Sequence, residues 1–478
     1  MMTNRVFRAL ALHALQTPLK VALRCGARSI SYGALAAFLA ESAEALADSP
    51  RVVGISTSDP LEAALADLAL TFYGHVVVHV PPFFSPTQRA HIAEAACIES
   101  FIGTSDASVA TEILPRPEDC PPLDGPRNLP VSGSRRIIFT SGSSGTPKGV
   151  LIGERQMAAA IAGLEKAILP RSRDTHLSLL PVAQLLEQIA GIYLPLLAGA
   201  EVCFCPEALT ALFGGPMGPV MAIMEAAQPT TTILVPALLA RIVSELKAMK
   251  CNAPENLRLV AVGGAKTSPA LLADAKAHGL PVYEGYGLSE CCSVVSMDRP
   301  SNPQPGTVGE ILDGVRVRID NGEIVVAGPT VMEGYIGQAP VTGEWHTGDL
   351  GRIENGRLIV EGRKDWLIVT PQGRNINPEW VESCLCADPD IPAAGLLLAE
   401  DDKLEIIAVI TASVEPNRIE HLMDDLPQYA RPARVRFAPA SQQGLLKPGG
   451  GIDRSQLGHL STVLPSHSLY NEQKERVA

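Results

Sequence analysis

Residues 137–150 read IIFTSGSSGTPKGV, in which a short β-branched and aromatic run is followed by seven consecutive Thr, Ser and Gly residues and then by PKG. Small residues let the backbone approach an anion closely, while consecutive N–H groups, hydroxyls and one lysine supply donors and positive charge. The spacing departs from the Walker pattern G-x-x-x-x-G-K-[ST], because Gly142 and Gly145 lie too close together and Gly149 follows the lysine. The stretch therefore predicts a phosphate-binding loop of a nucleotide enzyme outside the Walker class.

Further motifs follow this loop in order along the chain. GGA occupies residues 263–265 after an apolar run, YEGYGLSE occupies 283–290, WHTGDL occupies 345–350 and GRKD occupies 362–365. Together with the loop, these strings resemble the signatures of the adenylate-forming superfamily, which comprises acyl-CoA synthetases, peptide-synthetase adenylation domains and luciferases. They are closest in motif to fatty acyl-CoA synthetases, and the resemblance covers nearly the whole chain, as far as about Arg454.

The resemblance implies that the chain binds ATP and Mg²⁺. By position, Tyr286 would stack on the adenine, Ser289 would bind phosphate, and Glu290 would bind Mg²⁺, a hard cation that prefers oxygen ligands. Asp349 would accept hydrogen bonds from the ribose hydroxyls, and Arg363 would reach the ribose or phosphate as a rigid donor fork. The full set of nucleotide contacts implied is Thr140, Ser141, Gly142, Ser143, Ser144, Gly145, Thr146, Lys148, Gly264, Ala265, Glu284, Gly285, Tyr286, Ser289, Asp349 and Arg363.

The family carries a catalytic lysine near its C-terminus, in a G-K-hydrophobic-x-R context, and this chain departs from that pattern. Residues 447–454 read KPGGGIDR, and alignment on IDR places Gly451 at the lysine position. Attack of a carboxylate on the α-phosphate builds negative charge, and loss of a group that offsets it commonly costs ~10²–10³ in rate. We expect Lys447 to fold back and act as a catalytic residue together with Glu290 and Arg363. The alternatives are a preformed acyl adenylate as the substrate, an unusual nucleophile, or weak catalysis.

The substrate class is indicated by residues 176–200, HLSLLPVAQLLEQIAGIYLPLLAGA. This segment looks like the LSxLPLAHxxE stretch of long-chain acyl-CoA synthetases, but Gln184 stands where that stretch has histidine. Amino-acid activators place an acidic residue near the substrate ammonium, and no clear candidate is present. We expect an apolar pocket near Leu185, Ile189 and residues 235–239, which suits an acyl chain or an aromatic acid equally well. The expected substrate contacts are Gln184, Val235, Gly263 and Gly287.

The pattern of apolar runs predicts an α/β fold with two domains. Short β-branched runs alternate with longer Ala- and Leu-rich stretches through residue 282, which favours parallel-rich sheets with helices. Residues 306–362 are turn-punctuated and indicate an antiparallel β subdomain. We predict a large N-terminal domain over residues 1–364 and a small, mobile α+β domain over 365–478, with Asp365 at the hinge that the resemblance implies.

Composition limits the partners of the chain. The formal net charge is −12, with no basic stripe to displace counterions from phosphates, so no nucleic-acid partner is expected. No apolar run reaches the ~18 residues of a membrane-spanning helix, and a secretory signal is not expected. The ten cysteines show no CxxC…CxxC spacing, so we interpret them as mostly buried thiols in a reducing cytoplasm.

The function that the resemblance implies is a ligase reaction in two steps. MgATP and a carboxylic acid give acyl-AMP, and rotation of the C-terminal domain then lets a thiol, foremost that of CoA, attack the activated carbonyl. Gly373 would line the pantetheine path. A carrier-protein phosphopantetheine or an amine is an alternative acceptor. A nucleotide-binding protein with impaired adenylation is an alternative of another class, suggested by Gly451.

Overall fold

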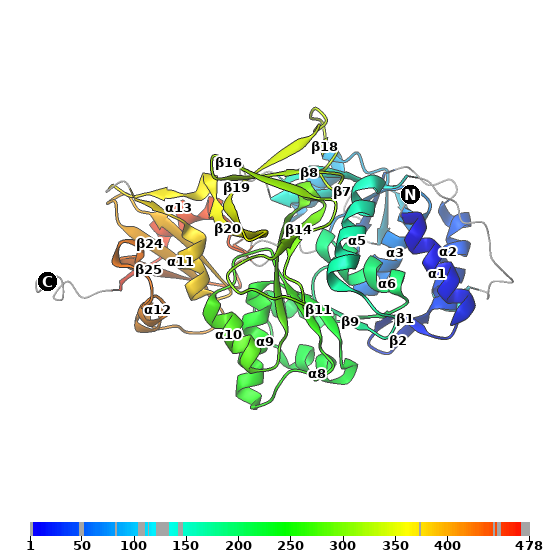
Figure 1. Cartoon of the computed structure of the whole chain (residues 1–478), viewed down its shortest axis with the longest axis horizontal. Coiled ribbons are helices and arrows are strands. Elements are labelled where there is room, and N and C mark those ends of the chain that lie inside the picture. The colour runs from blue at the N-terminus through cyan, green and yellow to red at the C-terminus, as the bar shows by residue number, and fades with distance from the viewer. Residues whose placement is uncertain are drawn as a thin grey trace, which may run out of the picture.

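The computed structural model describes residues 3–46, 52–81, 84–103, 110–112, 114–120, 133–141, 147–371, 374–442, 445–446 and 451–469, and the structural statements concern these ranges. Residues 142–146 of the predicted phosphate loop, Gly373 and Lys447 lie outside the described residues. The chain begins near one end of an elongated molecule, and its C-terminal part forms the other end (Figure 1).

A seven-stranded sheet carries the predicted phosphate loop. Its order is β18-β8-β7-β4-β3-β5-β6, and β3 to β7 run parallel. The strands are β3 Val52–Ser56, β4 Val76–His79, β5 Ser100–Gly103, β6 Ala110–Glu112, β7 Arg135–Ser141, β8 Pro147–Gly153 and β18 Gly334–Tyr335. β7 and β8 pair antiparallel, with Thr140 opposite Lys148, so the two ends of the loop lie side by side.

A thirteen-stranded sheet carries the later motifs, in the order β16-β17-β19-β20-β15-β14-β13-β12-β11-β9-β10-β1-β2. Its strands are β1 Val21–Cys25, β2 Arg28–Ser31, β9 Thr175–Ser178, β10 Glu201–Phe204, β11 Thr231–Leu234, β12 Leu259–Val262, β13 Val282–Leu288, β14 Ser293–Met297, β15 Glu310–Ile311, β16 Arg316–Asp320, β17 Glu323–Ala327, β19 Glu344–Glu354 and β20 Arg357–Arg363. The neighbouring strands β1, β10, β9, β11, β12 and β13 run parallel. From β13 onward the neighbours β14, β15, β20, β19, β17 and β16 pair antiparallel. The antiparallel region predicted for residues 306–362 thus extends the parallel sheet.

Helices pack against both sheets, which confirms the predicted α/β class (Figure 1). They are α1 Thr3–Gln16, α2 Tyr32–Leu46, α3 Pro60–Phe72, α4 Pro86–Ala95, α5 Glu154–Ile168, the π-helix Glu187–Tyr193, α6 Leu194–Ala198, α7 Glu207–Leu212, α8 Gly218–Ala227, α9 Pro236–Met249 and α10 Pro269–Ala277. Asp59 and Ser85 accept hydrogen bonds from the first-turn N–H groups of α3 and α4, and a proline follows each cap. Local capping chemistry therefore explains where these helices begin. None of the described helices combines the length and apolar character needed to cross a membrane.

The C-terminal part has hydrophobic clusters of its own, which begin at Ile376. It contains a β21–β22 pair and a four-stranded sheet β23-β24-β25-β26. Its elements are β21 Ile368–Val369, β22 Asn375–Ile376, α11 Pro378–Leu385, β23 Ala393–Leu398, β24 Leu404–Ile410, α12 Pro416–Leu422, β25 Arg434–Pro439, α13 Leu457–Val463 and β26 Ser466–Ser468. Short 3₁₀ helices cover Pro117–Asp119, Ser289–Cys291, Lys364–Trp366, Gln428–Ala430 and Arg454–Gln456. The domain boundary at residues 364 and 365 remains a prediction.

Candidate active site

A cavity of about 580 Å³ lies where β7, the ends of β12 and β13, and the C-terminal part meet. This volume is in the range of small-molecule sites. The sequence-predicted residues that line it are Thr140, Gln184, Val235, Gly263, Gly264, Ala265, Gly285, Tyr286, Gly287 and Ser289. The C-terminal part contributes Trp366, Glu379, Glu382, Ser383, Cys386, Pro392, Ala393, Ala394, Gly451, Ile452 and Arg454. Motifs from distant parts of the sequence therefore share one cavity.

Backbone geometry explains how the GGA and YEGYGLSE motifs reach this cavity. β13 lies parallel to β12, so the GGA turn after β12 lies beside the middle of β13. Gly287 approaches β14 so closely that a Cβ on it would lie 1.6 Å from the carbonyl oxygen of Ser293, which only glycine avoids. The β13–β14 pairing changes register between Tyr286 and Gly287. The glycines thus permit a close strand contact that places Tyr286 and Ser289 at the cavity wall.

Tyr286, Asp349 and Arg363 form one hydrogen-bonded cluster. Tyr286 Oη donates to Asp349 Oδ2 over 2.5 Å, and Arg363 Nη1 donates to Asp349 Oδ1 over 3.1 Å. Asp349 and Arg363 are direct partners in the β19–β20 pairing, which explains their contact. Burial raises the pKa of Asp349, opposed by the Tyr286 hydroxyl and the Arg363 charge. Arg363 Nε is buried without a hydrogen-bond partner among the described residues.

Among the residues predicted to contact the nucleotide or metal, Lys148, Glu284, Glu290, Asp349 and Arg363 do not line the cavity. Tyr335 connects Glu290 with Lys148. Tyr335 Oη donates to Glu290 Oε1 over 2.7 Å, and Lys148 Nζ lies 5.5 Å from the centroid of the Tyr335 ring. The pairing of β18 with β8 places Tyr335 opposite Val150, just after the predicted phosphate loop. The sequence analysis missed Tyr335, and the signal that could have found it is the aromatic residue after Gly334 in MEGYIG.

Much of the cavity lining is apolar. The apolar lining residues include Phe84, Ile138, Phe139, Leu164, Ile168, Leu180, Leu185, Leu186, Ala190, Val235, Leu288, Val294 and Met297. Gln184 also lines the cavity, whereas Ile189, Leu238 and Leu239 are completely buried and do not line it. The carboxylates among the described lining residues are Glu379 and Glu382, both from α11. Ala190 belongs to the π-helix, a conformation that is frequent at functional sites.

Two further carboxyl groups have perturbed acidity. Burial raises the pKa of Glu284 to about 7, although the Thr267 hydroxyl opposes the shift. Burial also raises the pKa of Glu382 to about 7, against the opposing charge of Arg454. Burial likewise raises the pKa of Glu379, and the Lys266 charge opposes the shifts of both Glu284 and Glu379. Lys266 lines the cavity directly after the GGA turn. Sequence reasoning missed this cation, although its position after GGA was visible.

The C-terminal part reaches the cavity through an arginine–tryptophan stack. The Trp366 ring lies 4.4 Å from Arg454 Cζ and 5.5 Å from Arg363 Cζ, both measured to the ring centroid. Arg454 also donates to Glu382 over 2.6 Å. Asp365 is exposed beside this stack, and its hinge role remains a prediction.

The donor set fits Mg²⁺ held jointly with a nucleotide. Within the described ranges, no group of three His, Cys, Asp or Glu side chains could hold a metal ion by itself. Mg²⁺ usually binds through one or two carboxylates together with substrate phosphates and water. Glu290 meets that requirement as a single carboxylate whose Oε1 is already held by Tyr335.

Comparisons with known proteins agree with this geometry. The AMP-binding enzyme family matches residues 10–336. The chain is 29% identical over 361 residues to 2-succinylbenzoate–CoA ligase of Bacillus velezensis, covering 70% of each chain. It is 26% identical over 344 residues to long-chain-fatty-acid–CoA ligase 1 of Cavia porcellus, covering 58% of this chain and 48% of the relative. The match thus spans about half the length of the second relative.

Solved structures share the fold. O-succinylbenzoate coenzyme A synthetase from Bacillus subtilis, in complex with ATP and magnesium ion, superposes with a TM-score of 0.77 at 23% identity, covering 94% of this chain and 98% of that one. ATP-bound MatB from Rhodopseudomonas palustris has a TM-score of 0.77 at 21% identity, covering 97% and 99%. The family match, the ordered motifs and the shared cavity together show that the chain belongs to the AMP-binding, adenylate-forming enzyme family.

Proposed function

We propose that the protein is an AMP-forming acid–thiol ligase. The observation that carries this proposal is that residues of the GGA and YEGYGLSE motifs line one cavity together with many apolar side chains. A carboxylic acid bound against the apolar lining would present its carboxylate to the α-phosphate of ATP bound along the motifs. Holding both reactants in the reactive orientation lowers much of the activation barrier of such a reaction.

The described residues would bind ATP through three groups of contacts. The Tyr286 ring would pack against the adenine, and the Asp349–Arg363 pair would receive the ribose. Lys148, at the start of β8 opposite Thr140, would face the phosphates. Mg²⁺ bound to Glu290 would neutralise phosphate charge and polarise the reacting phosphoryl group.

We propose a hydrophobic acid without an α-ammonium group as the substrate. The carboxylates among the described lining residues, Glu379 and Glu382, both come from α11, and the lining outside the C-terminal part contributes no carboxylate to pair with an ammonium. The named relatives act on 2-succinylbenzoate and on long-chain fatty acids. These names support an aromatic acid at least as well as a fatty acid, and the apolar wall suits both.

The proposed second step is transfer of the acyl group to CoA. A rotation of the C-terminal part about Asp365 would withdraw Gly451 and Arg454 from the cavity and open a path for the thiol. The names of the CoA ligases among the relatives support CoA. A carrier-protein phosphopantetheine remains the alternative acceptor.

Gly451 favours a second candidate function, a protein that binds nucleotide or acyl adenylate without efficient adenylation. Gly451 lines the cavity and brings no positive charge. Pyrophosphate exchange, measured across fatty acids, aryl acids and amino acids, separates the two functions. Robust exchange with any acid excludes the binding-only function, and preference for an α-amino acid would contradict the hydrophobic-acid assignment. Absence of exchange, with thioester formed from synthetic acyl-AMP, would support a protein that needs a preformed adenylate.

A further inference from the structure

Tyr335 contacts two residues that the sequence analysis assigned to different parts of ATP. Its Oη donates to Glu290 Oε1 over 2.7 Å, and its ring centroid lies 5.5 Å from Lys148 Nζ. A cation at that distance over an aromatic face is attracted by the ring quadrupole. One side chain therefore touches both the carboxylate assigned to Mg²⁺ and the lysine assigned to the phosphates.

The backbone holds Tyr335 in this position from several sides. β18 pairs with β8 at Tyr335 and Val150, and the Met332 N–H donates to the Glu290 carbonyl oxygen over 2.8 Å. Trp345 packs edge-on against the Tyr335 ring, with centroids 5.8 Å apart. Glu290 is thus held at its main chain by Met332 and at its side chain by Tyr335, which belong to one short segment.

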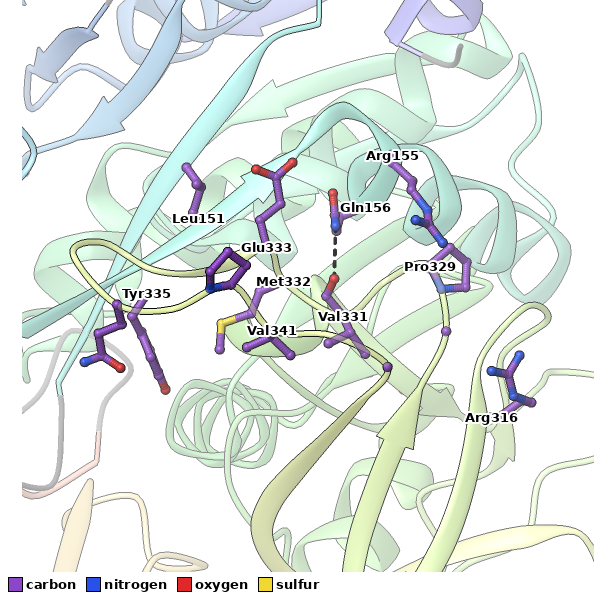
Figure 2. Close-up of a pocket in the computed structure, with 15 residues that line it drawn as sticks. Leu151, Arg155, Gln156, Arg316, Pro329, Val331, Met332, Glu333, Tyr335 and Val341 are labelled. Carbon is purple, nitrogen blue, oxygen red and sulfur yellow. Dashed lines mark hydrogen bonds between the residues drawn. The ribbon is translucent and has the colours of Figure 1, made fainter.

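The same segment is also anchored at Val331. Gln156 Nε2 donates to the Val331 carbonyl oxygen over 3.0 Å, at the wall of a second cavity of about 660 Å³ (Figure 2). Tyr335 lies at one end of that wall, several residues along the segment from Val331 (Figure 2). Gly334 has a φ of +148° where the chain enters β18, which an L side chain rarely adopts. These contacts therefore fix the conformation of the segment, which in turn fixes the position of the Tyr335 side chain.

We propose that Tyr335 is a positioning residue for the divalent cation and the phosphates of ATP. Its hydroxyl holds one oxygen of Glu290 and leaves Oε2, which has no hydrogen-bond partner in the described ranges, for the cation. Its ring holds the Lys148 ammonium beside the loop. The proposal rests on the proposed function, because it takes Glu290 as a ligand of the cation in the ATP complex.

Binding of Mn²⁺, measured by electron paramagnetic resonance in the presence of ATP and without any acid, tests the proposal apart from turnover. Loss of a group that orients a ligating carboxylate weakens metal binding by ~10–100-fold, and for this half-buried Glu290 we expect roughly 10-fold with Tyr335→Phe. Affinity for ATP in EDTA should stay unchanged in Tyr335→Phe, which keeps the ring, and should fall in Tyr335→Leu, which loses the contact with Lys148. Tyr429→Phe, at an exposed tyrosine of the C-terminal part, is the matched control and should change neither affinity.

A double-mutant cycle with Glu290→Gln assigns the effect to the contact between the two residues. Glu290→Gln should weaken Mn²⁺ binding, and adding Tyr335→Phe to it should weaken binding no further. Unchanged Mn²⁺ affinity in Glu290→Gln would remove the metal role of Glu290 and overturn the positioning role of Tyr335 with it, whereas the ligase function is tested separately by pyrophosphate exchange. An effect of Tyr335→Phe that is absent, or equal in both backgrounds, would overturn the positioning role while leaving Glu290 in place. A melting temperature lowered without a change in Mn²⁺ affinity would show a structural role only.

Discussion

We expect Gly451→Lys to accelerate acyl-adenylate formation. Gly451 lines the cavity, and a Cβ built on it would meet no atom within 4 Å. Its φ lies outside the range that strains L residues, so a side chain fits without a change of backbone. The chain directly after this position is held by the bridge between Ile452 and Leu446 and by the bond from Arg454 to Glu382. A lysine here would therefore extend from an anchored backbone toward the carboxylate and phosphate.

The size of the gain follows from the contact that the lysine would make. A hydrogen bond to a charged group contributes about 1.5–3 kcal/mol, which corresponds to roughly 10- to 150-fold in rate if it forms only in the transition state. The lower part of that range applies, because the new ammonium is not packed by neighbours and must be ordered during the reaction. We therefore expect an increase of roughly 10-fold in pyrophosphate exchange.

The assay compares pyrophosphate exchange with thioester formation from synthetic acyl-AMP. Exchange should rise in Gly451→Lys, while the second step should not, because it needs no charge at the α-phosphate. Gly451→Ala controls for the loss of glycine, and Gly458→Lys places the same charge on α13, where a Cβ also meets nothing within 4 Å. A folded Gly451→Lys protein with unchanged or lower exchange would refute the reasoning and would indicate that another group already supplies the charge.

Three further outcomes are expected. Lys266→Ala should reduce the rate of adenylation by up to ~5-fold, because a partly screened charge at the cavity lowers the activation free energy by about 1 kcal/mol. The control Lys276→Ala, on α10, should leave the rate unchanged. Because burial raises the pKa of Glu284 to about 7 from 4.5, the stability that this group contributes is present below pH 4.5 and is lost as the pH rises through 7. Urea unfolding should show Glu284→Gln more stable than the native protein at pH 8, by at most ~3 kcal/mol, with no difference near pH 4.5. Asp349→Ala should weaken ATP binding by roughly 10- to 150-fold in calorimetry, and an affinity within twofold of the native protein would contradict its ribose role.

Much of the candidate site could be predicted from the sequence because its motifs are local. Gly287 must be glycine for a steric reason that acts between neighbouring strands, and the chain signals this by a dense glycine pattern. Asp349 lies opposite Arg363 because both belong to one β-hairpin, formed by β19 and β20. Short-range requirements of this kind leave recognisable strings.

Other features of the fold and the site could not be predicted from the sequence motifs. The apolar pattern of residues 176–200 suits a buried helix, and it does not distinguish Leu185 at the cavity from Ile189 in the core. The π-helix at Glu187–Tyr193 differs from an α-helix only in its hydrogen-bond partners, which residue types do not specify. The antiparallel strands after β13 extend the parallel sheet because strand edges pair through backbone groups that every residue carries.

The sequence by itself determined the α/β class, the family and the order of the nucleotide motifs, because these depend on residue types within short segments. Only the tertiary structure decided which distant residues act together. Tyr335 lies 45 positions from Glu290, and their contact depends on a β18–β8 pairing between segments far apart along the chain. Such long-range pairing depends on how whole sheets pack in the folded core. The sequence motif therefore predicted a role for Glu290 but gave no prediction of the tyrosine that donates to it.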